Sequence, residues 1–178
     1  CIARVSSRSK TDPILEDNVK KFSSFVIAAA AMVCAASSAS AGSWTTGTYD
    51  LGGTLTLNQS ITLTCATSFD LNASSAAAGT VTSVDWGGCN GTLTPGAVSW
   101  VATPISATSA SIKLYVTTTL GHCDGTVTGT WNNATQKLTF PSGTTVPGKV
   151  FGISVPCAIT GVLTAVPVAP TTGALTLS

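Results

Sequence analysis

The sequence predicts an all-β fold, a single Thr-rich antiparallel β-sandwich or barrel of about ten strands. Threonine alternates with Leu, Val and Ile along much of the chain, and this alternation suits the pleated, half-buried surface of a strand. Turn-forming pairs such as Pro95-Gly96 and Pro147-Gly148 recur between the alternating runs, where they would reverse the chain. No linker interrupts the pattern, so residues 42–178 should form one domain that holds two disulfides and follows a signal peptide.

Residues 19–41 are predicted to be that signal peptide. Lys20-Lys21 precede the apolar stretch 22–36, and the small residues Ala39-Ser40-Ala41 follow it, as in a charged n-region, an h-region and a cleavage site. No later stretch approaches the roughly 20 apolar residues that a membrane-spanning helix needs. We therefore expect cleavage near Ala41 to release residues 42–178 as a secreted, extracellular or cell-surface bacterial domain without a membrane span.

Residues 1–18 precede this n-region and are charged, without hydrophobic periodicity. We interpret them as translated upstream sequence, with Val19 as the initiator. The alternative is an unusually long n-region. Cys34 lies in the apolar stretch and would leave with it, whereas lipid attachment at Cys34 is a competing interpretation that the preceding Ala31-Met32-Val33 disfavours.

Within the domain, the plainest alternation runs through residues 53–57 and 61–65, with a turn at 58–60. It directs the aliphatic side chains of these strands inward and the threonines outward. The pair Asp124-Gly125 is interpreted as another turn. Further strands are predicted at residues 80–86, 97–103, 109–118, 125–131, 137–140, 149–155, 158–166 and 174–177.

The cysteines left in the domain form an even set, as expected for paired thiols in an exported chain. Four half-cystines allow three connectivities, and the sequence does not choose among them. The half-cystines are Cys65, Cys89, Cys123 and Cys157.

Charged side chains are scarce after residue 41. Four aspartates and three lysines leave a net charge near −1, which cannot form the basic surface that nucleic acid requires. Little charge repulsion opposes association between copies, so the composition favours self-association or surface attachment.

The same scarcity leaves little for catalysis. The domain has one histidine and no glutamate, and no G-x-S-x-G elbow is present. His122 and Asp124 could form a dyad or ligate a metal, but alternation would let both point to solvent. We expect no enzyme activity, no metal site and no cofactor.

Two further features could support binding. The tryptophans, Trp44, Trp86, Trp100 and Trp131, could stack against a hydrophobic or carbohydrate ligand, although aromatic residues in strands more often belong to the core. The uncharged terminal segments could complete the sheet of a neighbouring copy by strand exchange, or they could pair within their own subunit. The residues concerned are Leu55, Leu57, Leu175 and Leu177.

Several segments together resemble the PraB-like family of secreted bacterial alkane-oxidation activators. The segments are Leu55–Leu57, Leu63–Cys65, Val84–Cys89, Leu120–Cys123, Gly129–Asn133 and Pro156–Gly161. The resemblance covers most of residues 51–167. It implies a secreted non-catalytic factor of the cell surface or biofilm, linked to poorly soluble hydrocarbon, and it supplies no catalytic residues.

A weaker likeness to fimbrial subunits rests on the alternating strand that runs to Cys65. The C-terminal residues 174–178 lack the penultimate aromatic residue of chaperone-assembled pilins. The sequence as a whole favours a structural or adhesive surface protein that self-associates into a matrix or fibre. The alternative is a secreted monomeric module that binds an apolar or carbohydrate ligand.

Overall fold

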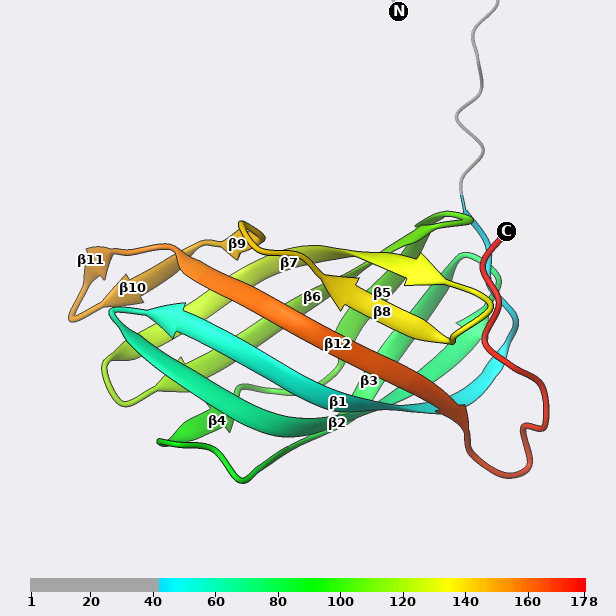
Figure 1. Cartoon of the computed structure of the whole chain (residues 1–178), viewed down its shortest axis with the longest axis horizontal. Coiled ribbons are helices and arrows are strands. Elements are labelled where there is room, and N and C mark those ends of the chain that lie inside the picture. The colour runs from blue at the N-terminus through cyan, green and yellow to red at the C-terminus, as the bar shows by residue number, and fades with distance from the viewer. Residues whose placement is uncertain (1–41) are drawn as a thin grey trace, which may run out of the picture. The chain divides into compact units, whose positions relative to one another are not determined.

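The computed structural model describes residues 42–178, and every regular element in this range is a β-strand (Figure 1). The all-β prediction is therefore confirmed. The predicted signal peptide and upstream segment lie outside the described residues. The strands are β1 (Gly47–Gln59), β2 (Ile61–Ser75), β3 (Ala78–Gly87), β4 (Leu93–Pro95), β5 (Trp100–Ser106), β6 (Ser109–Thr118), β7 (Gly121–Asn132), β8 (Lys137–Phe140), β9 (Thr145–Val146), β10 (Gly148–Val150), β11 (Ile153–Ser154) and β12 (Cys157–Pro167).

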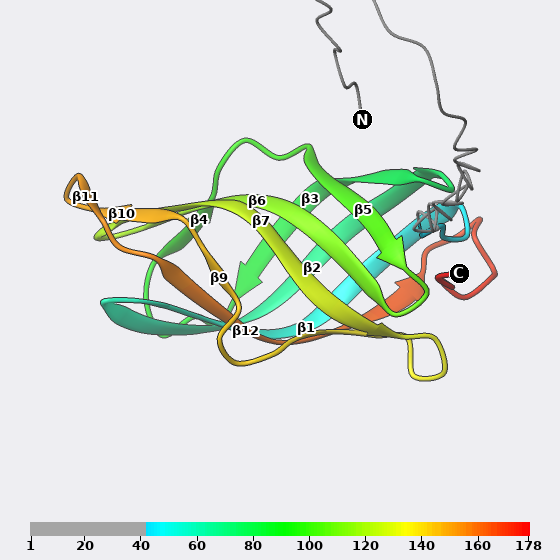
Figure 2. The ribbon, with the colours of Figure 1, turned by 90° about the horizontal axis from the view of Figure 1, so that it is seen from above.

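The sheet closes on itself, so the architecture is a barrel. Neighbouring strands follow the order β7-β8-β12-β1-β2-β3-β5-β6, and β6 returns to β7 through pairs from Ser109↔Thr130 to Thr117↔His122. All of these pairings are antiparallel. Figure 2 shows the strands winding around a common interior. The short strands β4, β9, β10 and β11 lie outside this ring.

The period-two pattern of the sequence produces the interior. In β2, Leu63, Cys65, Phe69 and Leu71 are buried, while Thr64 between them is exposed. Side chains from all around the ring fill the barrel, and a hollow lined by core residues such as Trp44, Leu71 and Trp131 holds about 10 Å³. That volume is about one water-sized probe, so the core is closely packed there.

Three local predictions were wrong. Residues 174–177 form a single bridge, Trp44↔Leu177, because this segment lies across the end of the barrel and is held there by its buried leucines. Residues 149–155 form the two short strands β10 and β11. Asp124-Gly125 lies inside β7 and not in a turn, since both residues pair with β6. Gly125 instead allows Val146 and Pro147 to approach, because a Cβ there would lie 2.8 Å from Pro147.

Both predicted disulfides form, and the structure supplies their pairing. Cys65 joins Cys89, which ties the loop after β3 to β2. Cys123 joins Cys157, which links β7 to the start of β12. No helix capable of crossing a membrane occurs in the described part of the chain.

Candidate functional site

The Cys123–Cys157 disulfide lies at the end of the barrel where β8 does not connect β7 to β12. Strand β8 reaches β12 only at Gly161–Thr164 and β7 only at Thr130–Asn132. Beyond β8, the short strand β9 pairs with Cys157, and the disulfide connects β7 to β12 directly. Both half-cystines are fully buried, so this end of the barrel is closed covalently where hydrogen bonding between strands is sparse.

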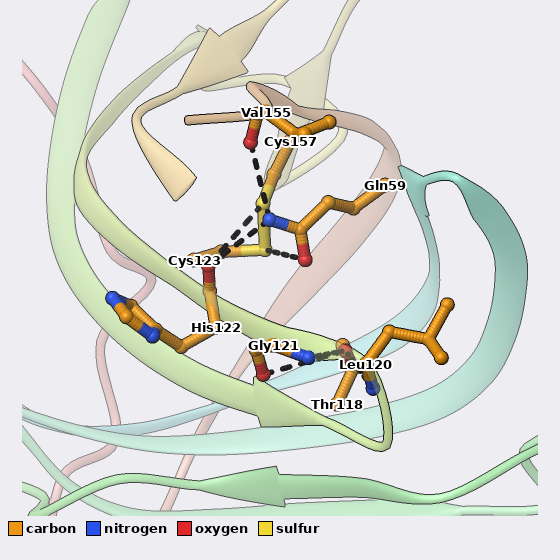
Figure 3. Close-up of a disulfide and its surroundings, with 8 residues drawn as sticks. All are labelled: Gln59, Thr118, Leu120, Gly121, His122, Cys123, Val155 and Cys157. Carbon is orange, nitrogen blue, oxygen red and sulfur yellow. Dashed lines mark hydrogen bonds between the residues drawn. A yellow bond between two sulfur atoms is a disulfide. The ribbon is translucent and has the colours of Figure 1, made fainter. Parts of the chain in front are cut away.

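Gln59, the last residue of β1, reinforces this closure from inside (Figure 3). Its side chain is buried, and Nε2 donates to the backbone carbonyls of His122 and Val155, each at 3.1 Å. The Oε1 atom lies 3.8 Å from Sγ of Cys123. The two carbonyls belong to the residues next to Cys123 and near Cys157, so Gln59 fixes the backbone on both sides of the disulfide. This arrangement anchors the base of the β10–β11 hairpin.

Replacing Gln59 with alanine should lower the free energy of unfolding by about 2 kcal/mol, because two buried carbonyls lose their donor. Urea denaturation followed by circular dichroism measures the change. The matched control is Asn58→Ala, since Asn58 is exposed and donates only to the Thr62 hydroxyl. That control should stay within about 0.5 kcal/mol of the parent. Equal effects of the two substitutions would contradict the role of Gln59.

The β10–β11 hairpin projects from the end of the barrel opposite the C-terminus (Figure 1). Phe151 and Gly152 connect its strands, and Val150 pairs with Ile153 across the turn. Phe151 is 79% exposed and Ile153 is 70% exposed, the highest values among the large apolar side chains of the described residues. We refer to residues 150–153 as the apolar tip.

The backbone of the apolar tip is unusual for the residues it contains. Phe151 has φ 48° and Gly152 has φ 85°, the signs of a type I′ turn, which favours Asn-Gly. A bulky residue at positive φ is an outlier and costs on the order of 1–3 kcal/mol. Both stability and solubility therefore disfavour phenylalanine here. Strained residues of this kind cluster at functional positions.

The tryptophans proposed for ligand stacking are mainly core residues. Trp44, Trp100 and Trp131 are 6%, 4% and 4% exposed. Trp44 donates its indole hydrogen to the carbonyl of Ser75 at 2.8 Å. Trp86 is half-buried and meets the ring of Phe69 edge-on. Buried rings offer no open face to a ligand, so these residues do not make a common stacking surface in the described structure.

The segments considered for strand exchange are paired within their own chain. Strand β1, which carries Leu55 and Leu57, lies between β12 and β2 and pairs with both along most of its length. Leu175 and Leu177 are buried in the same core. Neither edge of β1 is open in this arrangement.

His122 and Asp124 lie on the outer face of β7, on either side of the buried Cys123. Figure 3 shows the His122 ring directed away from the disulfide. Within residues 42–178, no hydrogen bond joins their side chains, and no group of three or more His, Cys, Asp or Glu residues could hold a metal ion. The His122 ring instead stacks on Tyr115, with centroids 5.6 Å apart. The geometry of a catalytic dyad is not present.

Phe151, Ile153 and Gln59 were not predicted as functional or structural centres from the sequence. One usable signal was the placement of Pro147-Gly148 and Pro156 around residues 149–155. The glycine in the middle of this segment, Gly152, indicates a turn at Phe151-Gly152. A phenylalanine at that position is an exposed one.

The fold and its surface define a class of protein, a disulfide-closed β-barrel with a packed interior and an apolar tip. The family model for the alkane oxidation protein activator PraA/PraB-like proteins matches residues 17–175. The chain therefore belongs to this family, in agreement with the resemblance found in the sequence. No curated protein matches the chain, and no solved structure matches it.

Proposed function

We propose that the protein is a non-catalytic, exported accessory factor that adheres to liquid alkane through the apolar tip. The observation that carries this proposal is the exposure of Phe151 and Ile153 on a projecting turn, while most other large apolar side chains are buried. The family description, an alkane oxidation protein activator, suggests which apolar phase is relevant. An activator that does no chemistry of its own can act by bringing the cell surface or another protein to the hydrocarbon.

The expected strength of this contact follows from the buried area. Moving a phenylalanine or isoleucine side chain from water into an apolar phase contributes about 1.5–3 kcal/mol. The two side chains together supply on the order of 4 kcal/mol, which corresponds to millimolar affinity. One copy would therefore bind weakly and reversibly, and stable attachment would require several copies on one surface.

The composition and anchoring of the β10–β11 hairpin lower the free-energy cost of moving its tip into an apolar phase. Lys149 is the one charged residue between Pro147 and Pro156, and it lies at the start of the hairpin, where its ammonium group can stay in water. The Cys123–Cys157 disulfide and Gln59 hold the base of the hairpin, so little conformational entropy would be lost on adsorption.

Assembly into a matrix or fibre remains a prediction from the low charge of the domain. The ends of the hydrogen-bonded strand order, β11 and β4, are the edges at which a second copy could pair. Both edges are short. Adhesion to hydrocarbon does not depend on such assembly.

Adsorption at the hexadecane–water interface tests the proposal. The double variant Phe151→Ser/Ile153→Ser should need at least about tenfold more protein for the same fall in interfacial tension, because the apolar contact is removed. The matched control is Ile105→Ser/Val166→Ser, which removes two exposed apolar side chains, 44% and 54% exposed, from the barrel wall. The control should adsorb like the parent. Equal losses in both double variants would show non-specific adsorption and overturn the proposal.

A further inference from the structure

A second surface feature lies on the barrel wall between β5 and β6. Strand β5 pairs with β6 only from Ala102↔Ile112 onward, while Trp100 and Val101 pair with β3. Residues 113–115 of β6 therefore have no partner strand on the β5 side, because β4 pairs with β6 only at Val116–Thr118. An open hollow of about 410 Å³ occupies this divergence, within the usual size range of small-ligand sites. We refer to it as the wall hollow.

Both faces of the barrel wall contribute to the wall hollow. Trp100 and Leu114 are buried, inward-facing residues, whereas Val101 and Tyr115 face outward, and all four line it. The hollow therefore reaches into the wall. Lys113, Asp124 and Ser99 add an ammonium group, a carboxylate and a hydroxyl to the same lining. An apolar floor with a few polar groups is typical of a binding site.

Several polar groups of this lining have no partner. The Nε1 atom of Trp100 is buried and unpaired, although buried indole N–H groups usually find an acceptor. Within residues 42–178, no hydrogen bond or ion pair engages the side chains of Lys113 and Asp124. Ser99 has φ 112°, a conformation that costs on the order of 1–3 kcal/mol and tends to occur at ligand sites.

Tyr115 is held in position beside the wall hollow. The backbone of Gly96 lies against its ring, so that a Cβ on Gly96 would overlap the ring carbons. Gly96 also donates its N–H to the Tyr115 carbonyl at 2.8 Å. The His122 imidazole stacks on the ring with an interplanar angle of 27°. The aromatic surface is thus preorganised, which reduces the entropy lost when a ligand binds.

A second hollow of about 300 Å³ adjoins the first along β7. His122, Lys149 and Ser154 line it, and Asp124 lines both hollows. Charged side chains and the histidine are few in this chain, yet half of those in the described residues gather on this strip: Lys113, His122, Asp124 and Lys149. The two hollows offer an elongated path for a ligand that extends past Asp124.

The mixture of groups selects among ligand classes. Liquid alkane would leave Lys113 and Asp124 desolvated without partners, which is costly, and a phosphate or uronate would meet the Asp124 carboxylate between the hollows. A pyranose ring can lay its C–H face on the ring of Tyr115, donate hydroxyl hydrogens to Asp124 and accept from Lys113 and Ser99. We propose that the wall hollow and the adjoining hollow bind a neutral oligosaccharide.

Titration of ¹⁵N-labelled oxidised protein with maltotriose, cellotriose and mannotriose, followed by heteronuclear NMR, tests this site. At least one trisaccharide should shift the amide signals of Tyr115, His122 and Asp124, and glucose or mannose should bind at least about fivefold more weakly because each fills one hollow. Tyr115→Ala and Asp124→Asn should each weaken binding by at least about fivefold. Tyr115→Phe keeps the ring and should retain binding.

Asp85→Asn is the matched control, because Asp85 lines a separate hollow between β2 and β3. It should leave the titration unchanged, as should Phe151→Ser/Ile153→Ser, so failure of this site is distinguishable from failure of the apolar tip. Absence of shifts with all three trisaccharides at roughly 10 mM would overturn the proposal. Shifts that map elsewhere, or that appear only with oligogalacturonate, would overturn it too.

Discussion

Removing the Cys123–Cys157 disulfide by Cys123→Ser/Cys157→Ser is expected to lower the free energy of unfolding by about 4 kcal/mol. The bridge spans 34 residues, and a cross-link of this length restricts the unfolded chain strongly. The native state is also destabilised, because two hydroxyl groups would replace a buried disulfide beside Gln59. Equilibrium denaturation in urea, monitored by tryptophan fluorescence, gives the value.

The matched comparison is Cys65→Ser/Cys89→Ser. This bridge spans 24 residues, so chain entropy alone predicts a cost only about 0.3 kcal/mol smaller. Cys89 is half-exposed on a peripheral loop, so a serine hydroxyl at residue 89 can reach water, whereas Cys65 is as fully buried as Cys123 and Cys157. We therefore expect the Cys123 and Cys157 pair to cost more by at least about 1 kcal/mol, the difference arising from burial. Equal costs would show that the closure of the wall at β7 and β12 adds nothing beyond chain entropy.

Period-two alternation was a reliable guide to the fold because it reports which side of a strand is buried. It predicted the inward leucines of β1 and β2, and it correctly gave β6 and β8 their full extent. The choice between sandwich and barrel could not be made this way. It depends on the pairing of β6 with β7, a contact between strands whose alternating patterns would look the same in either architecture.

The disulfide pairing was equally inaccessible from the sequence. Cys123 and Cys157 meet because β8 is too short to separate β7 from β12 at that end of the barrel. The residues around the two cysteines give no information about the length of β8. Asp124-Gly125 shows the opposite failure. Its turn preference is strong locally, but nine pairs between β6 and β7 and the nearby disulfide outweigh it.

The functional surfaces illustrate the same limit. Aromatic content pointed to the tryptophans and to Tyr115 without separating buried rings from exposed ones; three of the tryptophans fill the core, while Tyr115 and Phe151 are exposed. Phe151 is exposed because a two-residue turn places it at the tip, and Tyr115 borders a hollow because β5 leaves β6 at Ala102. Both facts depend on pairing between strands.

Because Phe151 is both exposed and strained, replacing it should change the stability of the protein and its adsorption to alkane in opposite directions. Phe151→Asn should raise the free energy of unfolding by about 1 kcal/mol, because Asn-Gly suits the positive φ of both turn residues. The same substitution should weaken adsorption at the hexadecane–water interface by about tenfold, because one of the two apolar anchors is lost. Urea denaturation and interfacial tension measured on one preparation give both numbers. The protein would then be more stable and less adhesive.

A matched substitution separates the two effects. Ser60 is an exposed turn residue with φ 65°, so Ser60→Asn should also stabilise the barrel slightly while leaving adsorption at the parental level. Phe151→Leu should keep most of the adsorption without relieving the strain. If Phe151→Asn proved more stable yet adsorbed like the parent, the phenylalanine would not be an anchor. If it proved less stable, the turn would depend on contacts of the ring, and its positive φ would not be a source of strain. If Phe151 is a strained side chain retained for contact with an apolar phase, its replacement must raise the free energy of unfolding and lower adsorption. Only substitutions at residue 151 should have both effects.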